Sequence, residues 1–269
     1  MASIDDIAAN FRCLDRFARA DTAIHRLDAR AKVLATLVFI VVVASFDKYA
    51  VAALLPFFVF PIVLAALGNL PTAFVVKNVA VAIPFALTIG LFNPVFDREL
   101  AFEIGSLQIS AGWLSCASIV IRAVLTLSAA FILVGVTGFP AVCEALERLG
   151  VPKAFVMQLQ FLYRYIFVLL EDAGRSARAL TLRSSGRPTR LSTVASLIGL
   201  LLMRTWQRAD RIHMAMLARA YSGGFHNRNT CRFGARETVF FLGWIAAFGL
   251  LRWCDASRYL GSLVERLVP

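Results

Sequence analysis

The stretch GWLSCASIVIRAVLTLSAAFILVGV, residues 112–136, decides the fold class of this chain. It contains a single charged side chain, Arg122. A helix that crosses the hydrocarbon core of a bilayer needs about 20 mostly apolar residues, so the stretch predicts a membrane-spanning helix. An arginine in mid-membrane costs roughly 2.5–3.5 kcal/mol on insertion scales. We therefore expect Arg122 to face the helix bundle or to reach the interface, either with a functional role or in a hydrogen bond between helices.

The rest of the chain has the composition of a membrane protein. Hydrophobic residues make up 59% of its 269 residues and its mean hydropathy is +0.72, whereas soluble domains are about 45–50% apolar. Four further apolar segments predict spanning helices, at residues 32–46, 51–67, 78–92 and 237–254. The predicted fold is an all-α polytopic membrane protein with about five transmembrane helices and long cytoplasmic coupling helices in a crossed arrangement.

The basic residues predict the topology. The chain has 28 Lys and Arg against 17 Asp and Glu, a net charge of +11. With five spans and a cytoplasmic N-terminus, 22 of the 28 basic residues fall on the inner side, in agreement with the positive-inside rule. We expect a multi-pass protein of the plasma (inner) membrane. Its predicted regions are a polar cytoplasmic lead-in at 1–31, transmembrane helices 1–4 at 32–136, cytoplasmic or interfacial coupling helices at 137–236, and the last transmembrane helix with the C-terminus at 237–269.

Two apolar stretches of the middle region, residues 155–170 and 194–203, leave a six- or seven-span model open. The first contains two glutamines and Arg164, and the second is too short to span alone. If both crossed, the strongly basic stretch between them would lie outside, against the positive-inside rule. We therefore prefer long helices whose apolar halves lie at or in the membrane and whose basic halves reach the cytoplasm.

The middle region predicts three helices. Gly138 ends the preceding span, and AVCEALERLG after it is a short amphipathic helix that stops at Gly150. A long helix follows at about 152–184, which ends in TLRSSG. Another runs at about 191–221 and ends in ARAYSGG. Each long helix begins apolar and ends basic, which indicates a weak two-copy repeat.

The arginines of the two helix ends repeat with the same spacing. Arg175 precedes Arg183 by eight residues, as Arg211 precedes Arg219, so each pair lies on roughly one face of its helix. Arginine near a helix C-terminus also complements the macrodipole, by about 0.3–1 kcal/mol, and that alternative needs no partner. Small residues let helices cross closely, which makes two crossing helices the expected arrangement. The small residues between the arginines are Ala177, Ala179, Ala215 and Ala218.

Catalytic and metal-binding patterns are missing from the sequence. None of the four lysines follows a glycine, which excludes a P-loop. The five cysteines and three histidines lack metal-site spacing, so we expect no cofactor and no metal site. The predicted spans hold no carboxylate, whereas ion-coupled transporters usually keep one there. The chain therefore looks like a subunit that docks onto another subunit; its basic excess follows topology, and no nucleic-acid partner is expected.

Five segments together resemble one membrane family. They are RLDARAK, LFNPVFDRE, TGFPAVCEALERLGVPKAFV, FLYRYIFVLLEDAGRSARALTLRSSG and RADRIHMAMLARAYSGGF. In combination they are similar to CbiQ, the transmembrane T component of energy-coupling factor (ECF) transporters of the cobalt type. The resemblance implies two coupling helices that each end in an Ala-Arg-Gly-like motif whose arginine docks into an ATPase. The matching motifs are Leu182-Arg183-Ser184 and Ala218-Arg219-Ala220, with Arg175 and Arg211 as a supporting basic face; the small flanking positions depart from the family pattern.

The resemblance also implies a function and partners. The chain would be a non-catalytic coupling subunit of an ATP-driven (ABC-type) cobalt importer that serves cobalamin biosynthesis. Its implied partners are two cytoplasmic CbiO-like ATPase subunits, a CbiM-like membrane S component with or without a CbiN-like subunit, and the lipid bilayer. Three alternatives stay open: the same subunit in a nickel importer, a stand-alone secondary transporter or channel, and a multi-pass membrane enzyme.

Overall fold

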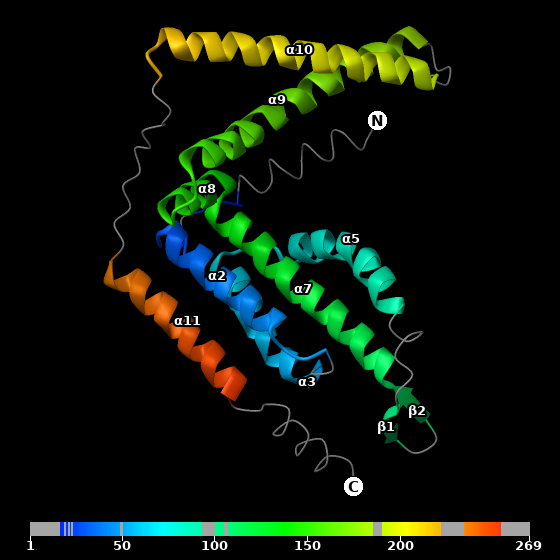
Figure 1. Cartoon of the computed structure of the whole chain (residues 1–269), viewed down its shortest axis with the longest axis vertical. Helices are drawn as coiled ribbons and strands as arrows, with labels where there is room; N and C mark the ends of the chain where they lie inside the picture. The colour runs from blue at the N-terminus through cyan, green and yellow to red at the C-terminus, as the bar shows by residue number, and fades with distance from the viewer. Residues whose placement is uncertain are drawn as a thin grey trace. The chain divides into compact units, whose positions relative to one another are not determined.

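The chain folds into two compact units in this computed structural model (Figure 1). One, the bundle unit, is formed by Phe17–Gly138 and Cys231–Pro269; the other, the arm unit, is formed by Met1–Arg16 and Phe139–Thr230. The structure describes residues 17–18, 20, 22, 24–48, 51–92, 100–104, 107–184, 190–221 and 234–253.

The described part of both units is helical apart from one hairpin, which confirms the predicted all-α class. The bundle unit contains α2 (Ala29–Ala44), α3 (Val51–Leu54), η1 (Leu55–Phe58), α4 (Val59–Leu67), α5 (Thr72–Leu91), α7 (Ala111–Thr137) and α11 (Ala235–Trp253). The arm unit contains α8 (Phe139–Arg148), α9 (Lys153–Ser184) and α10 (Leu191–Ala218). The hairpin was not expected from the sequence: strands β1 (Leu100–Ile104) and β2 (Leu107–Ser110) pair antiparallel just before α7.

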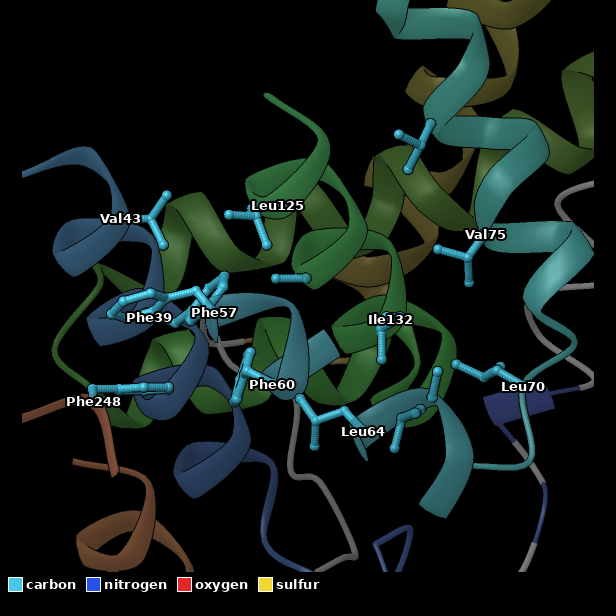
Figure 2. Packing of buried hydrophobic residues seen from close by; sticks show 14 of the residues in the cluster. Phe39, Val43, Phe57, Phe60, Leu64, Leu70, Val75, Leu125, Ile132 and Phe248 are labelled. Atoms are coloured by element: carbon cyan, nitrogen blue, oxygen red, sulfur yellow. The ribbon is translucent and has the colours of Figure 1, made fainter. Parts of the chain in front are cut away.

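A cluster of phenylalanines forms the centre of the bundle unit (Figure 2). Phe39 of α2 stacks on Phe60 of α4 with 4.5 Å between ring centroids, and Phe248 of α11 lies 5.2 Å from Phe60. Helix α7 packs against α2, α3, α4 and α5, and α11 packs against α2 and η1. Offset and edge-to-face contacts of this kind add to the packing of apolar area, so the cluster joins α11 to helices that precede it by some two hundred residues.

Proline divides one of the predicted spans and lies inside the helix of another. Pro56 lies in η1, and the segment predicted as one span at 51–67 is a succession of α3, η1 and α4. Pro84 lies inside α5, which bends in Figure 1. Proline lacks a backbone N–H and its ring displaces the preceding turn. The Thr88 hydroxyl donates to the Pro84 carbonyl at 2.8 Å, next to this interruption of the helix.

Three helices of the described chain are long and apolar enough to cross a membrane. They are Thr72–Leu91, Gly112–Thr137 and Lys153–Ser184. The first two are among the predicted spans, but the third is α9, which the sequence placed only partly in the membrane. Val51–Leu67 is shorter, and α2 has 16 residues. Among the described helices, length and composition therefore single out two of the five predicted spans together with α9.

Candidate functional site

Two glycines with positive φ set the ends of the helices that lead into the arm unit. Gly138 (φ 80°) ends α7, where its N–H donates to the Val134 carbonyl at 2.8 Å. Gly150 (φ 106°) ends α8, and the next N–H, of Val151, donates to the Leu146 carbonyl at 3.1 Å. Left-handed residues of this kind close helix C-termini and are most often glycine. Both stops were predicted from the sequence and are confirmed.

Helices α9 and α10 run antiparallel and cross, as the predicted fold required. An ion pair of 3.3 Å joins Asp172 of α9 to Arg208 of α10. The hydroxyl of Tyr221, just after α10, contacts the Met157 sulfur near the start of α9. The end of α9 and the start of α10 lie together, so the C-terminal ends of the two helices point away from each other (Figure 1).

Three of the four small residues proposed from the sequence do not form this crossing. Ala179, Ala215 and Ala218 are exposed, and the contact between the helices lies about two turns before them, at Asp172 and Arg208. Their spacing predicted the face that carries the arginines but not the point at which the helices meet. A small side chain permits two helices to approach closely but does not require them to do so.

The two motif arginines are exposed at opposite ends of the helix pair. Arg183 lies in the last turn of α9 and Arg219 is the C-cap of α10. Within the described residues, neither guanidinium has a recorded hydrogen bond or ion pair. Leu182 beside Arg183 is 83% exposed, and the Ser184 hydroxyl donates to its own helix, at the Thr181 carbonyl. Both arginines are therefore free to bind another molecule.

The arginines eight residues upstream are engaged within the helices that carry them. Arg175 pairs with Asp172 at 2.5 Å and with Glu171 at 3.4 Å, and the Arg211 Nε donates to the Gln207 carbonyl at 3.2 Å. A supporting role for this pair stays a prediction. These contacts distinguish Arg175 and Arg211 from Arg183 and Arg219, although all four arginines follow the same spacing in the sequence.

The Asp172 carboxylate pairs with one arginine of its own helix α9 and with one arginine of α10. The hydrogen bond from Arg175 lowers the pKa of the Asp172 carboxyl below its usual value, and the charge of Arg208 acts in the same direction. A carboxyl whose pKa is lower in the folded protein than in the unfolded chain stabilises the fold at any pH above its unfolded-state pKa of about 3.9. This stabilisation is lost as the pH falls through the pKa of the folded state. The carboxylate is thus charged, and both ion pairs are intact, at neutral pH.

The end of α10 is a Schellman motif with an alanine in the glycine position. The Tyr221 N–H donates to the Met216 carbonyl at 3.1 Å and the Ala220 N–H to the Leu217 carbonyl at 3.0 Å, while Ala220 has a φ of 53°. The same position is Gly150 after α8 and Asn69 after α4. A left-handed residue with a Cβ costs roughly 1–2 kcal/mol, so Ala220 holds its turn under strain.

Ala220→Gly is therefore expected to stabilise the arm unit by about 1 kcal/mol. The matched control is Ala218→Gly at the last helical position of α10, where glycine should destabilise by about 0.5–1 kcal/mol. Thermal unfolding of the purified protein in detergent, followed by circular dichroism, measures both. Equal destabilisation by the two substitutions would contradict the strain at Ala220.

An apolar groove of 490 Å³ separates the first half of α9 from the second half of α10. Its walls include Met, Phe, Leu, Ile and Val side chains, and Tyr221 also lines it. His213 and Arg208 contribute polar atoms to the lining. Helix α10 has no buried residue, so its other faces are open as well. Few apolar contacts hold this helix pair, which makes its geometry sensitive to the polar contacts between the helices.

Arg122 forms hydrogen bonds between helices of the bundle unit. Its Nη2 donates to the carbonyls of Phe46 (2.7 Å) and Asp47 (2.5 Å), just past the end of α2. Arg252 of α11 reaches the same segment: it donates to the Ser45 hydroxyl at 3.3 Å and lies over the Phe46 ring at 5.2 Å. Of the two roles left open by the sequence, the structure supports the hydrogen bond between helices.

The described residues hold no group of three or more His, Cys, Asp or Glu that could bind a metal. Cys116 and Cys143 are buried free thiols, and burial raises the pKa of Cys143 to about 11, so this thiol stays protonated at neutral pH. The remaining cysteines (Cys13, Cys231 and Cys254) and His226 lie outside the described residues. Nothing in the described part of the chain indicates bound-metal chemistry.

The fold and the site define a class: a multi-pass α-helical membrane protein whose arm unit presents two exposed arginines that have no partner among the described residues. The chain belongs to the cobalt transport protein family CbiQ, whose model matches residues 20–230. It is 28% identical to the energy-coupling factor transporter transmembrane protein EcfT of Heliobacterium modesticaldum over 78% of this chain and 84% of that one. For the EcfT of Thermosediminibacter oceani the identity is 27%, over 95% and 98%. The cobalt transport protein CbiQ of Salmonella typhimurium is 29% identical over 54% and 70%.

Proposed function

We propose that the chain is the transmembrane coupling subunit of an ATP-driven ECF-type cobalt importer. One observation carries the proposal: Arg183 and Arg219 are exposed and without a described partner at opposite ends of one crossed helix pair. Two arginines at opposite ends of a helix pair cannot line a single small-molecule site. They suit two separate acceptor sites, one on each of two cytoplasmic ATPase subunits.

The proposed mechanism uses the helix pair as a lever. ATP binding and hydrolysis move the two ATPases, the motif arginines transmit this movement to α9 and α10, and the helix pair reorients a membrane S component that holds the metal ion. Arginine suits the docking role because its guanidinium is always charged and donates hydrogen bonds in a fixed fork. In this proposal the N-terminus and the arm unit face the cytoplasm of the plasma (inner) membrane, and the chain itself catalyses no reaction.

Cobalt as the cargo rests on the names of the family and of the Salmonella relative. The described residues of this chain contain no cluster suited to bind a metal ion, which is consistent with a separate subunit that selects the metal. A nickel importer of the same construction is the second candidate. Uptake of each metal by the same assembled complex distinguishes the two.

Reconstitution tests the proposal. Liposomes that contain the chain together with its ATPases and S component are expected to accumulate cobalt when ATP is supplied, whereas liposomes that contain the chain alone accumulate none. The reason is that energy and metal selection both reside in other subunits. Cobalt uptake by the chain alone, driven by an ion gradient, would instead identify a stand-alone secondary transporter.

A further inference from the structure

Asp172 and Arg208 occupy equivalent positions in the two-copy repeat. The repeat relates Arg175 to Arg211 and Arg183 to Arg219 by a shift of 36 residues. The same shift relates Asp172 to Arg208, the two residues whose side chains form the ion pair between α9 and α10. The two helices thus meet at the same place in each copy.

This contact lies equally far from both motif arginines. Eleven residues separate Asp172 from Arg183, and eleven separate Arg208 from Arg219. At 1.5 Å per residue each interval is about 16 Å, and eleven residues are close to three full turns. Each motif arginine therefore lies on the same face as the ion-pair residue of its own helix, at the end of an arm of equal length.

Equal arms make the crossing angle the main determinant of the distance between Arg183 and Arg219. Each arm is a continuous helix from the ion pair to its arginine, so its length is fixed by hydrogen bonds within the helix. The angle between the helices is instead set by the side chains at the crossing and by the few contacts around the groove.

A single carboxylate, that of Asp172, is the shared counter-charge of two arginines at the crossing. Asp172 is 19% exposed and pairs with Arg175 of its own helix and with Arg208 of α10, which is 39% exposed. Without that carboxylate, two guanidinium groups would face each other with their common counter-charge removed. Like charges at this distance repel, so the crossing would loosen or change its angle while each helix remained intact.

We propose that the Asp172–Arg208 ion pair is the pivot of the α9–α10 lever and sets the separation of Arg183 and Arg219. The proposal rests on the function proposed above and adds positioning residues to it. Asp172 and Arg208 act through the motif arginines and do not touch the ATPases. Loss of the pivot should leave the docking arginines present but make their movement ineffective.

Spin-label distance measurements test the pivot directly. The labels replace Leu182 and Leu217, two exposed positions beside the motif arginines, in a background without the five native cysteines. The protein is held in lipid nanodiscs. Asp172→Asn is expected to shift and broaden the distribution of distances between the labels. An unchanged distribution would overturn the proposal.

Two further variants separate the pivot from a general loss of structure. Glu171→Gln is the matched control, because Glu171 is adjacent in the chain and pairs only with Arg175 among the described residues; its distribution should equal that of the parent. The exchange Asp172→Arg with Arg208→Asp restores opposite charges across the crossing and should recover the parent distribution. Failure of this exchange to recover it would show that the ion pair does not set the geometry.

The transport complex provides the second readout. With Asp172→Asn, the ATPases should still co-purify with the chain, while more ATP is hydrolysed per metal ion imported. An unchanged ratio of ATP to metal would overturn the coupling role of the pivot. Absence of ATPases from the parent complex would overturn the proposed function, and the distance measurement would still decide whether the ion pair sets the geometry.

Discussion

Replacement of both Arg183 and Arg219 with glutamate is expected to release the ATPases and to abolish metal uptake, while the chain still inserts into the membrane. Both side chains are exposed and have no recorded partner among the described residues, so folding does not depend on them. Removal of one member of a desolvated charge pair across an interface costs about 2–5 kcal/mol. Two such losses, at about 3 kcal/mol each, correspond to a loss on the order of 10⁴-fold in the combined affinity of the chain for the two ATPase subunits.

Affinity purification of the tagged chain from solubilised membranes measures the bound ATPases, and accumulation of radioactive cobalt measures uptake. The matched control is Lys153→Glu with Arg236→Glu, which changes the net charge by the same amount at exposed positions in the first turns of α9 and α11. Glutamate is favourable near a helix N-terminus, so the control should fold and retain its partners. Co-purification of an intact complex with the motif double variant would refute the docking role.

The two single variants refine this test. Arg183 and Arg219 lie at opposite ends of the helix pair, so each should contact a different ATPase copy. Arg183→Glu alone and Arg219→Glu alone are each expected to weaken retention of the ATPases less than the double variant does. A single substitution that removes both ATPases as completely as the double variant would show that the two sites are not independent.

Arg122→Leu is expected to lower the free energy of unfolding by about 2 kcal/mol. The substitution removes hydrogen bonds from a charged donor to the carbonyls of Phe46 and Asp47, and such bonds contribute about 1.5–3 kcal/mol. Water near the exposed Asp47 can hydrogen-bond to its carbonyl after the substitution, so part of this free energy is recovered. Unfolding of the purified protein by a denaturing detergent measures the change without a contribution from membrane insertion.

Arg252→Leu is the matched control for Arg122. Arg252 reaches the same end of α2, but through a 3.3 Å contact with the Ser45 hydroxyl and a contact with the face of the Phe46 ring. A cation–π contact at an exposed site is worth about 0.5–1 kcal/mol, so the control should lose at most about half as much stability. A loss at Arg122 no larger than that at Arg252 would contradict the structural role of Arg122.

Much of the fold could be predicted from local patterns in the chain. The predicted helices match the observed α7 and α8–α10 closely, because apolar length and glycine stops act over one or two turns. Helix α5 begins six residues before its predicted start. The division of 51–67 around Pro56 and the β1–β2 hairpin were missed. Pro56 was a signal in the sequence for the division of 51–67. The sequence of the two short strands carried no signal that favoured a hairpin over a loop.

The sequence predicted which residues form the candidate site but not how they are arranged. Sequence spacing marked Arg183 and Arg219 together with Arg175 and Arg211, and the structure leaves Arg183 and Arg219 exposed. It did not distinguish them from Arg175 and Arg211, because engagement depends on which acceptor lies within reach. Asp172 was overlooked, although its position three residues before Arg175 on one helix face was a usable signal.

The sequence by itself determined that this protein is an apolar, helical membrane protein with a duplicated basic helix end, since these properties depend on composition and on spacing within single helices. Only the tertiary structure decided that Arg122 bonds to the end of α2 and that Asp172 meets Arg208. The physical reason is distance along the chain. Contacts between residues 36 or more positions apart depend on how whole helices pack, and no local pattern encodes that packing.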